Sequence, residues 1–353
     1  MTPEQALNLA KTVADLYAEA TARILTLIAA TAAKGMESPA WQQERLAELV
    51  ILRRNTARIV AAMQQHGTSQ VLTALEEAYR GGRLTPALTR PGMVAVPQRA
   101  VVTLAADTTR VLDSTGPRVL RWAEDVYRQV IAEAVGPTIV GVETRREAAA
   151  RAMDRFAARG VTGFTDSAGR NWALDTYAEM ATRTAAGTAY RVGKVDRFRE
   201  SGVSLVVVSD SPEECEVCRP WEGMVLSLDG GEPTAAELGG AEFGGTVADA
   251  EAAGIGHPNC THTYEAFTPG LTDTPTPEAN PDGYQARQRQ RELERRVRES
   301  KRRVAALKPL GKTPQLARAQ QLLGARRTAL LEHNTAFDRK QHVSDRRVQL
   351  THR

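Results

Sequence analysis

The chain contains 353 residues, of which 42% are hydrophobic and 25% are charged. This composition excludes a wholly disordered chain, the 3 cysteines are too few for a disulfide scaffold, and the length predicts two or three folding units. The longest uncharged run near the N-terminus, 24–33, is shorter than the roughly 20 apolar residues that cross a bilayer, so the sequence predicts no membrane-spanning segment. Met1–Glu4 lacks the basic and apolar regions of a secretory signal, so we expect the protein to form in a cytoplasm.

Residues 1–159 predict a helical region with short connections. Thr2 followed by Pro3 is typical of a helix start, and apolar residues from Leu7 to Ile28 then repeat at helical spacing. Glycine and proline mark the other expected boundaries. We therefore expect further helices from Ser38 to Gly67, Thr68 to Tyr79, Gln98 to Ser114, Arg118 to Val135 and Thr144 to Arg159, with a loop over Arg83–Pro97.

Residues 160–267 predict a compact α+β domain. The turn residues 166–169 separate two short runs, 161–164 and 171–174, as in a β-hairpin, and a helix over 175–199 follows. The remaining expected elements are strands at Leu205–Val208, Met224–Leu226 and His262–Phe267, and a glycine-rich surface excursion at Gly239–Gly256.

The C-terminal part predicts a linker followed by a helical tail. Four prolines among small polar residues indicate an extended linker over 268–283. In the tail, 284–353, Pro309–Gly311 separates two helices. The first has a narrow coiled-coil-like stripe formed by Leu293, Val297, Ser300, Val304 and Leu307. The predicted fold class is therefore mainly α with a central α+β domain, a helical N-terminal region and a basic helical C-terminal tail.

Charge is distributed unevenly along the chain, whose formal net charge is +4. Residues 284–353 contain 19 Lys and Arg against 6 Asp and Glu, whereas residues 1–283 contain 27 against 36. A basic tail on an acidic body is typical of a protein with a polyanionic partner, and a solvated helix surface is the alternative. The candidate contacts to double-stranded DNA or another acidic surface are Arg295, Arg296, Arg298, Lys301, Arg302, Arg303, Arg326 and Arg327.

The 3 cysteines lie in one stretch with two histidines. Cys215 and Cys218 form a C-x-x-C knuckle, His257 and Cys260 form an H-x-x-C knuckle, and His262 follows. Zinc takes four sulfur or nitrogen ligands in a tetrahedron, so the two knuckles predict a Cys3His site. His257 is the predicted fourth ligand and His262 the alternative. Because four protein ligands leave no position for water, we expect the zinc to be structural.

Two other interpretations of these residues stay open. A C-x-x-C pair also fits a redox dithiol, which is expected near a βαβ pattern, whereas a Pro-Trp-Glu-Gly turn follows here. The cysteines could instead be buried thiols beside surface histidines. If His257 did not bind the ion, an open fourth position would again allow catalytic zinc.

No sequence motif predicts catalysis. Cys260 and His262 are close in sequence, but such neighbours seldom face each other as nucleophile and base, and no third group marks a triad. The alternative function is an enzyme, either a zinc-dependent hydrolase or an ADP-ribosyl-transferring effector. It would have to recruit Arg183, Ser209 and Glu222, whose ordinary roles are a helix ion pair, a strand-end cap and a turn residue. A host DNA-binding regulator is a third possibility, with a basic tail but no recognisable reading helix.

An ordered series of motifs resembles the phage minor capsid protein family, the MuF-like minor head proteins of tailed bacteriophages. The motifs are Gly160–Trp172, Leu174–Thr184, Leu205–Asp210, Cys215–Gly223 and His257–His262, followed by the basic tail. The resemblance covers about 160–353, and the N-terminal half matches no motif of the family.

The resemblance implies a structural, non-enzymatic head protein of the virion, present in few copies in the capsid interior or at the portal vertex. The implied partners are the portal protein or the major capsid protein, bound through the helical N-terminal region, and packaged DNA, bound through the tail. No small-molecule substrate is expected. The metal-type positions carried over are Cys215, Cys218, His257, Cys260 and His262, and no catalytic residue is carried over.

Overall fold

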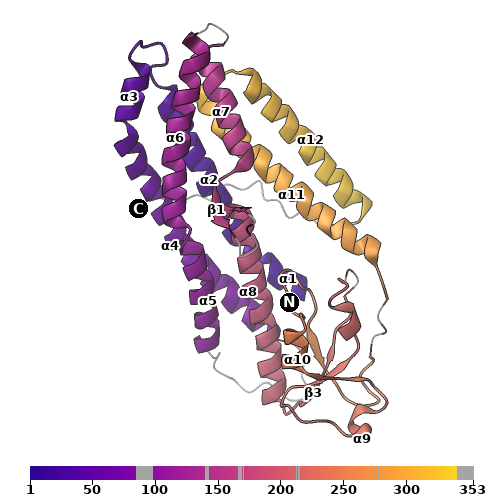
Figure 1. Ribbon diagram of the computed structural model, residues 1–353. Helices are drawn as coiled ribbons and strands as arrows, with labels where there is room; N and C mark the ends of the chain where they lie inside the picture. The colour runs from indigo at the N-terminus through magenta and orange to yellow at the C-terminus, as the bar shows by residue number, and fades with distance from the viewer. Residues whose placement is uncertain are drawn as a thin grey trace. The chain divides into compact units, whose positions relative to one another are not determined.

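The computed structural model describes residues 1–84, 98–139, 143–165, 169, 171–211, 213, 215–274, 276 and 278–339 (Figure 1). This part of the chain is mostly helical with a small mixed sheet, which confirms the predicted mainly α fold with an α+β part. It divides into two compact units built from non-consecutive segments. Unit 1 contains Met1–Lys11, Thr68–Thr109 and Glu179–Gln288, and unit 2 contains Thr12–Gly67, Arg110–Ala178 and Arg289–Arg353. The predicted four-part division of the chain stays a prediction.

The helices begin and end largely where caps and glycines indicate. Thr2 and Thr144 each accept a hydrogen bond from the backbone three residues on, which confirms the two predicted starts. The helices are α1 (Pro3–Asn8), α2 (Ala10–Ala33), α3 (Trp41–Ala47), α4 (Leu49–Arg83), α5 (Gln98–Asp113), α6 (Gly116–Ile139), α7 (Arg145–Arg159), α8 (Leu174–Glu200), α9 (Ala235–Leu238), α10 (Val247–Ala252), α11 (Pro281–Leu307) and α12 (Pro314–Ala336), with 3-10 turns η1 (Arg219–Trp221) and η2 (Lys308–Leu310).

Two predicted helix breaks are wrong. Helix α4 continues through Gly67, and α6 continues past Gly136–Pro137 to Ile139. A glycine inside a helix costs about 1 kcal/mol, which packing can outweigh. At Gly67 the packing partner is the Tyr17 ring, to which a methyl group at this position would approach within 3.3 Å. The predicted loop over 85–97, the hairpin turn residues 166–168 and the chain beyond 339 lie outside the described residues.

Within unit 2, buried polar groups fix the helices to one another. The Trp41 indole donates to the Ala32 carbonyl at 3.0 Å, and the Tyr127 hydroxyl donates to the Arg45 carbonyl at 2.8 Å. The β1 (Thr162–Thr165) and β2 (Asn171–Ala173) strands pair antiparallel in this unit, which confirms the predicted hairpin.

Helices α11 and α12, which belong to unit 2 from Arg289 onward, confirm the predicted tail helices and the break between them. Leu293 and Val297 of the predicted stripe pack with Leu330 of α12 in one hydrophobic cluster. Thr313 caps the restart by accepting a hydrogen bond from the Leu316 backbone at 3.2 Å. Helix α11 begins at Pro281, inside the predicted linker.

The four-stranded sheet lies in unit 1, in the order β5-β4-β3-β6. Its strands are β3 (Leu205–Val208), β4 (Val225–Ser227), β5 (Phe243–Thr246) and β6 (Tyr264–Ala266). Strand β3 pairs antiparallel with β4 and β6, and β4 pairs parallel with β5. The predicted surface excursion over Gly239–Gly256 is wrong, because it contains β5 and α10. We attribute β5 to pairing with β4, since its own sequence (Phe-Gly-Gly-Thr) has little strand propensity.

Helices α4 and α8 approach closely at two glycines of unit 1. A methyl group added at Gly82 would overlap the Tyr190 carbonyl oxygen, and one at Gly193 would overlap the Tyr79 carbonyl oxygen. Both obstacles are backbone atoms, which cannot rotate away as a side chain can. The two glycines therefore permit the contact between these helices.

We expect Gly82→Ala and Gly193→Ala each to lower the free energy of unfolding by about 1–3 kcal/mol, because the helices must separate. Gly324→Ala in α12 is the matched control, since among the described residues nothing beyond its own helix's nearby backbone lies within 4 Å of its added methyl group. The control should be neutral or should stabilise by up to about 1 kcal/mol. Urea unfolding of the three variants measures the difference, and equal effects at all three positions would contradict the interpretation.

Helices α1 and α2 together, Pro3–Ala33, are long and apolar enough to cross a bilayer by length and composition alone. The core helix of a globular protein passes the same test, and 56% of the most apolar window is buried inside this protein. The helix is therefore weak support for a membrane span, and the predicted absence of one stays a prediction.

Candidate metal centre

Two loops at one edge of the sheet carry the predicted knuckles. Val208, the last residue of β3, pairs with Tyr264, the first residue of β6. Because these neighbouring strands are antiparallel, the loop that follows β3 and the loop that precedes β6 leave the sheet at the same edge. The knuckles lie in these two loops, 42 residues apart along the chain but adjacent in space.

Local turns shape each knuckle. The backbone N–H groups of Cys218 and Arg219 both donate to the Cys215 carbonyl, at 3.1 and 3.0 Å, which closes the first turn. In the second knuckle the Cys260 N–H donates to the His257 carbonyl at 2.9 Å. Asn259 there has a φ of 69°, a left-handed conformation that asparagine tolerates better than most residues. The first turn thus brings the donor atoms of Cys215 and Cys218 within 4.8 Å of each other, whereas Cys260 of the second turn groups with His262.

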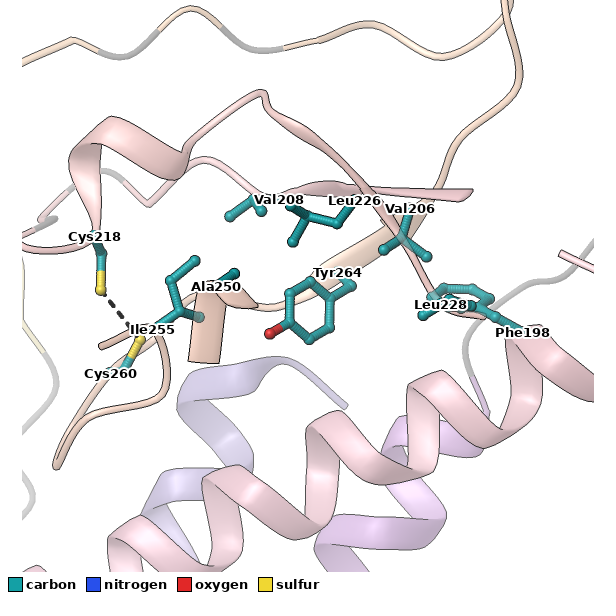
Figure 2. Packing of buried hydrophobic residues seen from close by; sticks show 10 residues of the cluster. All are labelled: Phe198, Val206, Val208, Cys218, Leu226, Leu228, Ala250, Ile255, Cys260 and Tyr264. Atoms are coloured by element: carbon teal, nitrogen blue, oxygen red, sulfur yellow. Dashed lines mark hydrogen bonds between the residues drawn. The ribbon is translucent and has the colours of Figure 1, made fainter. Parts of the chain in front are cut away.

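The structure brings all five predicted donors together. Cys215, Cys218 and His257 form one group and Cys218, Cys260 and His262 a second, and the donor atoms of each group lie within 4.8 Å of one another. Figure 2 shows the sulfurs of Cys218 and Cys260 pointing toward each other, and they are 3.8 Å apart. The Cys260 sulfur lies 3.6 Å from His262 Nδ1.

The donors lie at the end of the hydrophobic core of unit 1. Cys218, Cys260 and His262 are buried, whereas Cys215 and His257 are partly exposed. The core beside them contains Phe198 from α8 and apolar residues of the sheet and of α10, as Figure 2 shows. An ion held here would therefore be largely shielded from water.

A buried carboxylate holds the ring of His262. Glu222 Oε1 lies 2.6 Å from His262 Nε2 and also accepts a hydrogen bond from the Ser211 backbone at 3.1 Å. Burial lowers the pKa of His262, but the contacts with Cys260 and Glu222 outweigh this and raise it. Burial likewise raises the pKa of Glu222, against the opposing effect of His262. With Nε2 on the carboxylate, Nδ1 faces the Cys260 sulfur.

Mutual contact separates the pKa values of the two buried thiols. The hydrogen bond from the Cys218 thiol lowers the pKa of Cys260 to about 3, and contact with His262 acts in the same direction against burial. The same hydrogen bond, together with burial, raises the pKa of Cys218. A lowered pKa favours the thiolate of Cys260, which is the form of cysteine that binds metal ions.

Cys218, Cys260 and His262 have the spacing expected of ligands of one tetrahedral ion. With metal–sulfur bonds of about 2.3 Å and metal–nitrogen bonds of about 2.0–2.1 Å, sulfurs on one ion lie about 3.8 Å apart and sulfur and nitrogen about 3.6 Å apart. The observed separations are 3.8 Å between Cys218 and Cys260 and 3.6 Å between Cys260 and His262. The Cys/His group could hold a metal ion.

A family model described as phage minor capsid protein 2 matches residues 1–334. The chain belongs to this family. The match includes the helical N-terminal half, so the expectation that the likeness begins near residue 160 is wrong. No curated protein and no solved structure matches the chain. Membership supports a structural role in the capsid and places this minor capsid protein in the phage virion.

The three residues considered for an enzyme have ordinary contacts in the minor capsid protein. Arg183 Nη1 lies 3.8 Å from Glu179 one turn away on α8. Ser209 caps the end of β3, where its hydroxyl accepts a hydrogen bond from the Thr263 backbone at 3.1 Å. Glu222 lies in a turn, as predicted, but its contact with His262 was not predicted. No spacing rule relates a turn glutamate to a histidine 40 residues later, so only the fold reveals the pair.

Arg191 of α8 is a second residue near the donors that the sequence did not indicate. It is buried, and its charge contributes to the low pKa of Cys260, after the larger effect of Cys218. A methyl group at Gly256, next to His257, would lie only 2.6 Å from its guanidinium. Helical spacing identifies the face of α8 that carries Arg191 but not the loop that this face meets.

The candidate DNA-contact residues differ in their ion-pair partners and in their exposure to solvent in the minor capsid protein. Arg302 and Arg303 pair with acids of the same unit, Arg302 with Asp175 at 2.9 Å and Arg303 with Asp154 at 2.6 and 2.7 Å. Other candidates with partners inside unit 2 are Arg298, with Asp175, Arg326, with Glu299, and Arg296, with Glu292. Lys301 is partly buried, whereas Arg295, Arg296 and Arg327 are exposed.

Proposed function

We propose that this chain is a MuF-like, non-enzymatic minor head protein that binds the portal or the inner face of the capsid shell during head assembly. The family match over residues 1–334 carries the proposal. We further propose that the protein is present in few copies and lies in the capsid interior or at the portal vertex. It would contribute to DNA packaging or delivery.

The ion is proposed to be zinc, held by the three cysteines and one of the two histidines. Two features support zinc: the donors are cysteine sulfur and imidazole nitrogen, and the Cys218–Cys260 and Cys260–His262 separations fit a tetrahedron. When bound, zinc would cross-link the loop after β3 to the loop before β6. The chain's own residues orient the donors, because Glu222 holds His262 and the turn at Cys215 aligns the first knuckle. This role is structural.

The capsid role is tested by locating the protein in phage particles. Purified virions should contain the chain in low copy number, comparable with the portal protein and far below the major capsid protein, by quantitative mass spectrometry. Cross-linking of assembled heads should connect it to the portal protein or to the inner surface of the shell. Absence from the virion, or a copy number equal to that of the shell subunit, would reject the proposal.

Contact with packaged DNA is proposed for the exposed arginines Arg295, Arg296 and Arg327. Arginines that neutralise phosphates release counterions, so affinity falls steeply with salt. We expect the full chain to bind double-stranded DNA of any sequence far more tightly at about 50 mM than at about 300 mM salt. Arg295→Gln with Arg327→Gln should reduce that salt dependence, as measured by fluorescence anisotropy. Affinity that does not change with salt would contradict DNA contact through these residues.

A further inference from the structure

We propose that His262, and not His257, is the histidine ligand of the ion, and that Glu222 is the positioning residue that fixes the His262 ring. This assignment rests on the proposed zinc centre and selects its fourth ligand. It reverses the preference for His257 that the knuckle spacing alone favoured.

The sulfur–nitrogen distances favour His262 over His257 as the ligand. Two ligands of one tetrahedral ion, a sulfur and a nitrogen, lie about 3.6 Å apart. His262 Nδ1 is 3.6 Å from the Cys260 sulfur, as this geometry requires. His257 Nε2 is only 3.0 Å from the Cys215 sulfur, which would require a sulfur–metal–nitrogen angle of about 87° rather than the roughly 109° of a tetrahedron. The distance therefore indicates that His257 is a hydrogen-bond partner of Cys215.

Burial and the contact made by the second ring nitrogen also favour His262 as the ligand. The side chains of His262 and Glu222 are 2% and 0% exposed, and they meet at 2.6 Å. A metal-binding histidine commonly donates its other N–H to a carboxylate, which fixes the tautomer and the ring orientation. His257 is partly exposed, and its second ring nitrogen reaches only the carbonyl of the adjacent Pro258, at 3.0 Å.

Glu222 also links the two knuckles. It lies four residues after Cys218, in the turn that follows η1, and it contacts a histidine that precedes β6. The Ser211 backbone N–H donates to the same carboxylate oxygen and anchors it to the end of β3. The first loop therefore orients a ligand of the second loop before any ion binds. Glu222 therefore acts as a positioning residue for His262.

The test is zinc affinity of the full chain, measured by competition with a chromophoric chelator, for wild type, Glu222→Gln, His257→Ala and Cys218→Ser. Glu222→Gln keeps the shape of the side chain but removes its charge, and we expect zinc affinity to fall about 10–100-fold. His257→Ala should change affinity less than Glu222→Gln does. The d–d absorption of the Co²⁺-substituted protein should shift in Glu222→Gln and stay unchanged in His257→Ala, a response that a general loss of stability does not produce.

Each outcome decides one question. If wild type binds no zinc, or Cys218→Ser binds it as tightly as wild type, the proposed zinc centre itself fails. If wild type binds zinc and His257→Ala loses more affinity than Glu222→Gln, the centre stands and His262 is not the ligand. Unchanged affinity and an unchanged Co²⁺ spectrum in Glu222→Gln would overturn the positioning role of Glu222.

Discussion

Replacing Cys218 by serine should remove zinc from the protein and unfold the sheet region of unit 1, because Cys218 belongs to both donor groups. Structural zinc contributes an apparent binding free energy of about 10–16 kcal/mol to the folding of zinc-finger peptides. The sheet of unit 1 has short strands of three or four residues, so we expect it to depend on the ion. Elemental analysis should fall from about one zinc per chain to none, and limited proteolysis should cut within 205–267.

Val217→Ser is the matched control for this experiment. Val217 lies between the two cysteines of the first knuckle, its side chain is exposed, and it offers no ligand atom. This variant should keep its zinc and its resistance to protease. A Cys218→Ser protein that resists protease as well as Val217→Ser does would show that the region folds without the ion. Treatment of wild type with a strong chelator should reproduce the Cys218→Ser pattern.

Loss of the Asp175 charge is expected to destabilise unit 2 by about 3–5 kcal/mol, because it leaves buried arginine charge without a partner. Asp175 is 2% exposed, and its Oδ2 lies 2.9 Å from Arg302 and 3.4 Å from Arg298, both on α11. These contacts fix α11 to the start of α8, where Asp175 is the second residue. Asp175→Asn keeps the shape of the side chain and removes only the charge, and urea unfolding measures the effect.

Glu292→Gln provides the comparison on α11 itself. Glu292 pairs with Arg289 and Arg296, each at 2.5 Å, but the arginine side chains are about half exposed to water, where such pairs contribute about 0–1 kcal/mol. A double-mutant cycle of Asp175→Asn and Arg302→Gln should show a coupling of at least about 1 kcal/mol. Equal losses for Asp175→Asn and Glu292→Gln would show that the buried pair has no special role.

These ion pairs change how the basic tail is understood. The excess of positive charge in 284–353 predicted a polyanionic partner outside the protein. In the described part of the chain, Arg302 and Arg303 instead bind Asp175 and Asp154 of the same unit. Part of the tail charge therefore holds helix α11 to its own unit, and the exposed Arg295 and Arg327 are better placed to meet an external surface.

Local sequence determined those features that depend on residues a few positions apart. Cys215 and Cys218 lie on one turn, so their spacing alone was enough to predict that their sulfurs come together. Thr2 and Thr144 cap helices through backbone groups three residues on, and both starts were predicted. The apolar stripe of α11 likewise depends only on helical spacing.

Tertiary structure decided what depends on partners far away in the sequence. Strand β5 forms beside β4, although its glycines predicted a loop. Glu222 was predicted as a turn residue, and the fold places it against His262, which changes the preferred fourth ligand. Arg302 was predicted as a contact to DNA or another acidic surface, whereas its guanidinium pairs with Asp175, 127 residues earlier. Helix periodicity and turn composition describe contacts along a few residues of chain, whereas burial of charge and strand pairing are settled only when distant segments meet.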